Sequence, residues 1–310
     1  MCFLCYNNQA FALKHEKNGY KFAGKPYSEE KNMKMILGLD AGSSTTKLMA
    51  LTEDGAKFIV PMRMGPMSDH KSFCAALSRF AADNAMTEED FLYVGVTGSR
   101  ATEAGDEILG VPVRRINEIE AMAAGALRFS GQEKGVVVNI GTGTALIYAE
   151  KGKAPQHIFG SAVGGGTLVG LGSKLLNTKN YTEMLFMAGK GDRTKTDISI
   201  SDIDLKEVKS LDPRLTLSNF GKIYDAEDVN EQDLAASLVN MILEVVGTEA
   251  MLACRSVNCD TAIIAGALAD IPNSQEVFDL IGSLCGVKFV KAGMSTFVTA
   301  AGALLCAMEK

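Results

Sequence analysis

Residues 38–47 read GLDAGSSTTK and directly follow the apolar run MIL at residues 35–37. A second apolar run, LMAL, begins at once at residues 48–51. Glycine allows the backbone to approach a ligand closely and to point successive N–H groups at one anion. The stretch therefore predicts a strand, a tight turn of glycine and hydroxyl residues that can bind phosphate, and a second strand.

The same layout occurs again further along the chain. The apolar run GVVV at 135–138 leads into NIGTGTA at 139–145, and LIYA follows at 146–149. Two such turns predict two related lobes that grip one polyphosphate from both sides. Neither turn has the Gly-Lys-Ser/Thr ending of a Walker loop, and neither opens a helix as in a dinucleotide-binding fold. Two ordinary hairpins are the alternative interpretation.

Composition narrows the class of protein. With 310 residues, 47% of them hydrophobic and 22% charged, the chain has the size and balance of a two-domain globular enzyme. The net charge of -6, without a long basic run, argues against a nucleic-acid partner. No apolar run is long enough to predict a membrane-spanning helix. Seven scattered cysteines without a secretory signal indicate reduced thiols and a cytoplasmic location.

The sequence divides into three parts. Residues 1–34 lack apolar periodicity, and we expect a poorly ordered N-terminal extension that can be removed. Alternating strand and helix patterns predict an α/β fold with an N-terminal lobe at 35–134 and a C-terminal lobe at 135–310. The apolar stripe of one long helix is wider than one lobe needs, which predicts a homodimer built partly on that helix. The expected helices cover residues 71–84, 117–131, 167–176, 232–257 and 297–308, and the long one is 232–257.

Two charged residues lie within the first turn. A carboxylate beside a phosphate is unfavourable unless a cation stands between them, so Asp40 is a candidate ligand for Mg²⁺. The alternative role of Asp40 is to cap the turn through its side chain. Lys47 can reach a phosphate or can be a solvated strand residue, and the pattern leaves both roles open.

Glu118 is the candidate general base. It lies with Glu120 on the first turn of the helix expected at 117–131, where residues two apart point in different directions. Asn117 is the expected N-cap, and Glu120 would complete a capping box, which leaves Glu118 to accept the proton of a substrate hydroxyl. Acidic residues also favour helix starts through the helix dipole, so a purely structural role is the alternative.

Further glycines indicate contact with an anion or a flat ligand. Gly164, Gly165 and Gly166 precede the helix expected at 167–176, whose free N–H groups can bind an anion. Three consecutive glycines cost stability, which favours a functional reason for them. Gly266 ends a short apolar strand and allows a ligand to approach the backbone.

Residues 38–47 resemble the first phosphate loop of the superfamily of actin, sugar kinases and heat-shock chaperones. From Met35 to Lys310, the chain resembles type II pantothenate kinases. The stretches that carry this resemblance are NIGTGT at 139–144, GSAVGGGTLVGL at 160–171, GDR at 191–193 followed by Asp197, LTLSNFG at 215–221 and TAAGAL at 299–304. The resemblance implies an actin-like ATPase fold, in which two ribonuclease-H-like lobes have a nucleotide cleft between them.

The resemblance also implies a reaction, in which ATP with Mg²⁺ phosphorylates pantothenate at its primary hydroxyl, the first step toward coenzyme A. It implies that Glu118 is the catalytic base and that the protein is a homodimer. Coenzyme A or an acyl-CoA is an expected feedback ligand. The residues expected to contact the nucleotide are Asp40, Gly42, Ser43, Ser44, Thr45, Lys47, Gly141, Thr142, Gly143, Thr144, Gly164, Gly165, Gly166 and Gly266.

Two positions on the substrate side depart from the family pattern. His157 stands where the family usually has Arg, and a neutral His lacks the permanent charge and the two-pronged donor of Arg. Ala145 stands where the family tends to have Ser. Together with Gly160, these residues are the predicted substrate contacts, and they leave open a kinase that acts on another hydroxylated substrate.

Two other classes of protein stay open. The ATPases that activate 2-hydroxyacyl-CoA dehydratases share the fold, and TGSR at 97–100 resembles them. Those proteins bind an iron–sulfur cluster through cysteines, for which this sequence offers no convincing context. The other class is a catalytically inactive nucleotide sensor, which would bind ATP without turnover.

Overall fold

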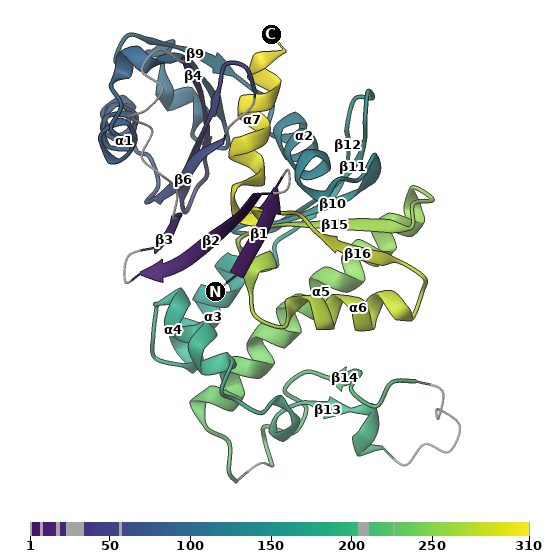
Figure 1. Ribbon diagram of the computed structural model, residues 1–310. Helices are drawn as coiled ribbons and strands as arrows, with labels where there is room; N and C mark the ends of the chain where they lie inside the picture. Colours follow the sequence, from purple (N-terminus) through teal and green to yellow (C-terminus); the bar gives the residue numbers. More distant parts are fainter. Residues whose placement is uncertain are drawn as a thin grey trace. The chain divides into compact units, whose positions relative to one another are not determined.

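The computed structural model describes residues 2–6, 9–16, 19–22, 34–55, 58–203, 211–225 and 227–309. The chain forms two compact units, Met1–Gly131 with Phe297–Lys310 and Gln132–Thr296. Each unit contains its own mixed sheet with helices (Figure 1), so the predicted α/β class is confirmed. The C-terminal segment from Phe297 clusters with the first unit, whereas the sequence analysis assigned it to the C-terminal lobe.

The six-stranded sheet of the first unit has the order β6-β5-β4-β7-β9-β8. Its strands are β4 (Met35–Ala41), β5 (Thr46–Thr52), β6 (Phe58–Met64), β7 (Phe91–Thr97), β8 (Glu107–Ile108) and β9 (Val111–Arg115). β4 pairs antiparallel with β5 and parallel with β7. All seven residues of β4, including Asp40, are buried, as expected for a strand in the middle of a sheet.

Three helices complete the first unit, namely α1 (His70–Asp83), α2 (Glu118–Ser130) and α7 (Val298–Met308). α2 and α7 lie side by side in Figure 1, and two glycines allow this close contact. A Cβ atom at Gly125 would collide with the carbonyl of Val298, and one at Gly302 would collide with that of Ala121. The small residues at this contact thus allow α7 to pack closely against α2. The candidate base, Glu118, is the first residue of α2.

The second unit repeats the strand order of the first. Its sheet is ordered β12-β11-β10-β15-β16, with β10 antiparallel to β11 and parallel to β15. In both main sheets the first strand along the chain is central, a meander of two further strands lies on one side of it, and two parallel strands lie on the other. The first unit adds β8, antiparallel to β9, at the edge. The strands are β10 (Lys134–Ile140), β11 (Thr144–Glu150), β12 (Gln156–Ser161), β15 (Thr261–Gly266) and β16 (Lys288–Lys291), and a separate pair is β13 (Ile198–Ser199) with β14 (Thr216–Ser218).

The helices of the second unit are α3 (Gly165–Leu175), α4 (Tyr181–Ala188), α5 (Glu231–Ser256) and α6 (Ser274–Ser283). α5 is the only helix in the described part of the chain whose length and composition would suffice to cross a membrane. Its apolar residues, including Leu238, Ile242 and Val246, belong to the buried core of this unit. The long apolar helix is therefore explained by packing within its own unit.

The first strands of the chain form a sheet of their own. β1 (Cys2–Tyr6), β2 (Gln9–Glu16) and β3 (Gly19–Phe22) pair antiparallel in that order. The sequence pattern did not predict these strands. The other residues of the expected extension, except Lys34, lie outside the described residues.

Candidate active site

The first glycine turn joins β4 to β5, as predicted. The N–H of Gly42 donates to the carbonyl of Thr45 at 3.2 Å, and the register places Asp40 opposite Lys47. A Cβ atom at Gly42 would lie 2.9 Å from the Thr45 oxygen, so the turn requires glycine there. Residues 42–45 remain partly or fully exposed, which leaves this turn open to a ligand.

Asp40 and Lys47 form an ion pair within this turn. The Lys47 Nζ lies 2.9 Å from Asp40 Oδ2, and both side chains are largely buried. Lys47 is therefore not a solvated strand residue. Asp40 supplies one carboxylate, which fits Mg²⁺, an ion that takes one or two carboxylates and completes its shell with phosphate oxygens and water. No group of three or more metal-ligating side chains occurs among the described residues.

Glu118 is the first residue of α2 and belongs to the same unit as Asp40 and Lys47. Burial of the carboxyl group is the largest effect on its pKa and raises it, although the side chain as a whole keeps an exposed surface. The negative charge of Asp40 raises the pKa of Glu118 further, while Lys47 lowers it. These couplings place the candidate base near the charged pair of the first turn.

The start of α2 is capped as predicted. The side-chain oxygen of Asn117 accepts hydrogen bonds from the N–H groups of Ile119 at 2.9 Å and Glu120 at 3.3 Å. The reciprocal bond of a capping box, from Glu120 back to Asn117, is not present in this described segment. The cap alone therefore fixes the first turn of α2, and Glu118 is not needed as a cap.

The second glycine turn joins β10 to β11 and contacts the later glycines directly. Gly165 N–H donates to the carbonyl of Gly141, and Gly166 N–H donates to that of Thr142, both at 2.8 Å. A Cβ atom at Gly164 would lie 2.9 Å from backbone atoms of Gly143. The structure thus brings the two predicted glycine segments of this unit together.

The expectation of free N–H groups at residues 164–166 is wrong. Gly165 and Gly166 give their N–H groups to the second turn, and Gly164 N–H donates to the Thr167 side chain at 3.2 Å. The three glycines are explained by close packing, because side chains would separate α3 from the turn. Their hydrogen bonds hold the second glycine turn, at Gly141 and Thr142, in its conformation.

Gly266 has an equivalent in the first unit that the sequence analysis did not identify. Gly266 ends β15 with φ +90°, and a Cβ atom there would collide with the backbone of Ile140. Gly98 follows β7 with φ +95°, and a Cβ atom there would lie 2.6 Å from the carbonyl oxygen of Ala41. Each glycine lets a parallel strand end directly beside a glycine turn. The repeated strand order is the signal that would have identified Gly98.

The predicted substrate residues lie on the β11–β12 hairpin. Ala145 is paired with Gly160, and His157 is paired with Ile147 after a β-bulge. His157 is exposed. A Cβ atom at Gly160 would meet only an ordinary contact, 3.5 Å from the Thr144 oxygen, so packing does not require glycine there. All three predicted substrate residues thus lie on one hairpin of the second unit.

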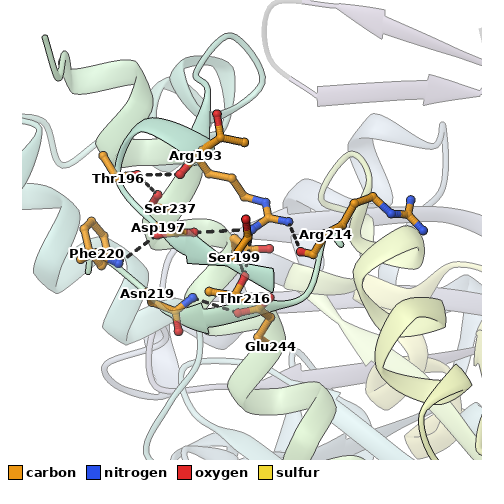
Figure 2. Close-up of polar contacts among 12 residues, drawn as sticks. Arg193, Thr196, Asp197, Ser199, Arg214, Thr216, Asn219, Phe220, Ser237 and Glu244 are labelled. Atoms are coloured by element: carbon orange, nitrogen blue, oxygen red, sulfur yellow. Dashed lines mark hydrogen bonds and ion pairs between the residues drawn. The ribbon is translucent and has the colours of Figure 1, made fainter. Parts of the chain in front are cut away.

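Two further stretches that resemble the family form one polar network in the second unit (Figure 2). Arg193 donates to the Thr216 side chain and to the carbonyl of Arg214, each at 2.9 Å. The Asp197 Oδ1 accepts the N–H of Phe220 at 2.9 Å. Burial raises the pKa of Asp197, and Arg193 lies 3.7 Å from its other oxygen.

This network holds residues 191–197 against 214–220. A cavity of about 140 Å³ lies beside it. Its lining residues are Arg193, Thr194, Asp197, Ser199, Ser201, Pro213 and Arg214. None of the predicted nucleotide or substrate residues lines this cavity. The network is therefore a feature of the second unit that is separate from its glycine turn.

Comparison with solved structures defines the class of protein. Component A of (R)-2-hydroxyglutaryl-CoA dehydratase from Acidaminococcus fermentans is similar with a TM-score of 0.62 at 16% identity, covering 89% of this chain and 98% of that one. A ROK family glucokinase from Streptomyces griseus has a TM-score of 0.59 at 14% identity, with 89% and 100% covered. These similarities confirm the actin-like ATPase fold, and at such low identity they show the fold alone.

Sequence comparison decides the family. A type II pantothenate kinase from Oceanobacillus iheyensis is 31% identical over 249 residues, which cover 78% of this chain and 88% of that protein. The family model described as Fumble matches residues 135–282. The chain belongs to the type II pantothenate kinase family. It is accordingly a kinase, a phosphotransferase with an alcohol acceptor, and the predicted family is confirmed.

Proposed function

We propose that this chain transfers the γ-phosphoryl group of ATP to the primary hydroxyl of pantothenate. The observation that carries the proposal is the grouping, in one unit, of the first glycine turn, its Asp40–Lys47 ion pair and a Glu118 carboxyl of raised pKa. A carboxylate near a phosphate-binding turn is placed to accept the proton of an attacking hydroxyl. The family relationship supplies the substrate class.

Each residue of this group has a distinct role in the proposed reaction. The first glycine turn, residues 42–45, binds phosphate oxygens through its exposed polar groups, and the second turn, residues 141–144, has the same role. Asp40 would hold Mg²⁺, which would neutralise charge on the phosphates when bound. Lys47 keeps Asp40 in place through their ion pair. Glu118 takes the hydroxyl proton as the oxygen–phosphorus bond forms.

The hairpin with Ala145, His157 and Gly160 sets the choice of substrate in this proposal. His157 stands where the family usually has an arginine with a permanent charge. An anionic substrate is therefore bound by a weaker hydrogen-bond donor at this position. The test is ADP release with ATP and Mg²⁺ across a panel of small hydroxylated acids. We expect the highest kcat/KM with pantothenate. A different acid with a clearly higher kcat/KM would support a kinase of the same fold with another substrate.

The alternative role as an activator of a 2-hydroxyacyl-CoA dehydratase has support from the fold alone. The buried Cys254 and the half-buried Cys74, Cys259 and Cys285 are free thiols. Iron analysis of anaerobically purified protein separates the two roles. The kinase proposal predicts protein without stoichiometric iron, and an iron–sulfur chromophore would favour the activator.

We further propose that the enzyme works in the cytoplasm as a homodimer. α5 contributes little exposed apolar surface, because most of its apolar residues are buried in its own unit. Leu252 of α5 is an exception with an exposed side chain, and it is a candidate for the contact together with Leu217 and Tyr224 of the same unit. Light scattering should report twice the monomer mass at micromolar concentration, and a monomer would refute this part.

Regulation by coenzyme A or an acyl-CoA is a prediction from the family resemblance. Its measurement is the rate of ADP release at a fixed pantothenate concentration, with and without added acetyl-CoA. A fall in rate that is relieved by more ATP or more pantothenate would support a feedback ligand. An unchanged rate at millimolar acetyl-CoA would contradict the prediction of feedback regulation.

A further inference from the structure

A cysteine and a histidine that the proposed reaction does not use lie together on α1. His70 opens the helix, and Cys74 follows one turn later on the same face. The Cys74 Sγ lies 3.4 Å from His70 Nε2, within hydrogen-bond distance for sulfur. A thiol beside an imidazole is the pairing that activates cysteine nucleophiles in other proteins.

A backbone carbonyl fixes the orientation and the tautomer of the His70 ring. His70 Nδ1 lies 2.8 Å from the carbonyl oxygen of Ala104. A carbonyl can only accept, so in the neutral imidazole the proton is on Nδ1 and the lone pair is on Nε2. The lone pair therefore faces Cys74, which donates its S–H. This is the order of nucleophile, base and orienting group that general-base activation requires.

The surroundings leave the pair accessible from one side. Cys74 is half-buried and packs against the core of the first unit, while His70 is exposed. Gly105 lies close to the imidazole, since a Cβ atom there would be 3.3 Å from Nδ1. The ring is thus held between α1 and the segment 104–105, and a small reagent can reach the sulfur.

Two other half-buried thiols of the chain lack this arrangement. Cys259 donates to the carbonyl of Thr261 at 3.5 Å, and Cys285 donates to that of Ile281 at 3.7 Å. A backbone carbonyl accepts a hydrogen bond but does not take up the proton. These two cysteines are therefore matched controls with similar burial and no base.

We infer that Cys74 is a modification site, a nucleophilic thiol that forms a mixed disulfide with small-molecule disulfides, with His70 as its base. Cys74 Sγ attacks one sulfur of the reagent, its proton passes to His70 Nε2, and the disulfide bond of the reagent breaks. The departing sulfur leaves as a thiolate. The alkyl thiolate from hydroxyethyl disulfide takes the proton from His70, whereas the aromatic thiolate stays ionised and His70 releases the proton to water. The cysteine sulfur is oxidised, and the released sulfur is reduced.

The test is the rate of modification of each cysteine in the folded full-length chain. The probes are dithiobis(nitrobenzoate) and the uncharged hydroxyethyl disulfide, with peptide mass spectrometry after quenching at several times. Cys74 should react at least about tenfold faster than Cys259 and Cys285 with both probes. His70→Gln should remove most of this advantage, and Ser78→Ala on the same helix should leave it unchanged.

Two results would overturn the inference. One is a Cys74 rate no higher than that of Cys285 in the unaltered protein, a comparison that does not depend on any variant folding. The other is an unchanged Cys74 rate in a folded His70→Gln variant, judged by circular dichroism. Cys74→Ser serves as the blank for the yellow product of the aromatic disulfide.

Discussion

At the scale of single residues, Glu118 carries the chemical step of the proposed reaction. Glu118→Gln keeps the size and much of the hydrogen bonding of the side chain but cannot take a proton. We expect kcat to fall by about two orders of magnitude or more, while ATP binding changes little. The measurement is steady-state turnover together with calorimetric ATP titration.

Glu120→Gln is the matched control for this variant, since it changes a neighbouring carboxyl on the same helical turn. Near-normal turnover is expected for it. Near-normal kcat in Glu118→Gln would instead show that the base is another group, or that the transfer is loose enough to need little base.

The charge environment of Glu118 predicts a pH dependence. Glu118 must be ionised to accept a proton, and its pKa is raised, so kcat should begin to fall on acidification above the ordinary range of a glutamate. Lys47 lowers this pKa. Lys47→Met should therefore move the acid limb of the kcat profile to higher pH, whatever it does to ATP affinity. Lys71→Met on the surface of α1 is the control, and a limb that stays in place in Lys47→Met would contradict this coupling.

At the scale of elements, the contact between α3 and the second glycine turn supports the proposed phosphate site. A Cβ atom at Gly165 would lie 2.9 Å from the Gly141 oxygen and 3.1 Å from Leu268 Cδ1. Gly165→Ala should displace the turn and weaken ATP binding by roughly tenfold, which is about 1.4 kcal/mol. Gly170→Ala, in the same helix with no atom within 4 Å of the new Cβ, should leave binding unchanged. Equal affinities for the two variants would show that the contact does not shape the site.

The glycine turns and their flanking strands were predictable because apolar runs end abruptly at glycine and hydroxyl residues. β9 was not predicted, since its sequence VPVRR contains proline and is only partly buried. α4 was not predicted either, because a helix of eight residues is too short to show a clear helical periodicity in its apolar residues. The purpose of Gly164–Gly166 was misread, because a glycine that packs on another backbone looks the same in sequence as one that binds an anion.

The grouping of Glu118 with Asp40 and Lys47 was beyond prediction from spacing. It depends on the distant helix α7, which packs both on α2 and on β4. Gly125 and Gly302 allow the close contact of α2 with α7. The resemblance to a family, and not periodicity, therefore supplied the role of Glu118.

At the scale of the whole molecule, the N-terminal strands are separable from the two main sheets. Among the described strands, β1, β2 and β3 pair with one another and with no other, and the six-stranded sheet begins at Met35. A chain that starts at Met35 should keep its melting temperature and its kcat. The measurements are thermal unfolding and turnover of both lengths side by side. A lower melting temperature in the shorter chain would show that the N-terminal sheet packs on the body.

The most direct test of the central claim is the identity of the product formed from ATP, Mg²⁺ and pantothenate by the full-length protein. Mass spectrometry and phosphorus NMR of the quenched reaction should show 4'-phosphopantothenate accumulating in equal amount to ADP, and Glu118→Gln should suppress both together. ADP release that is independent of pantothenate, or a folded protein that binds ATP and forms no phosphorylated product, would contradict the account.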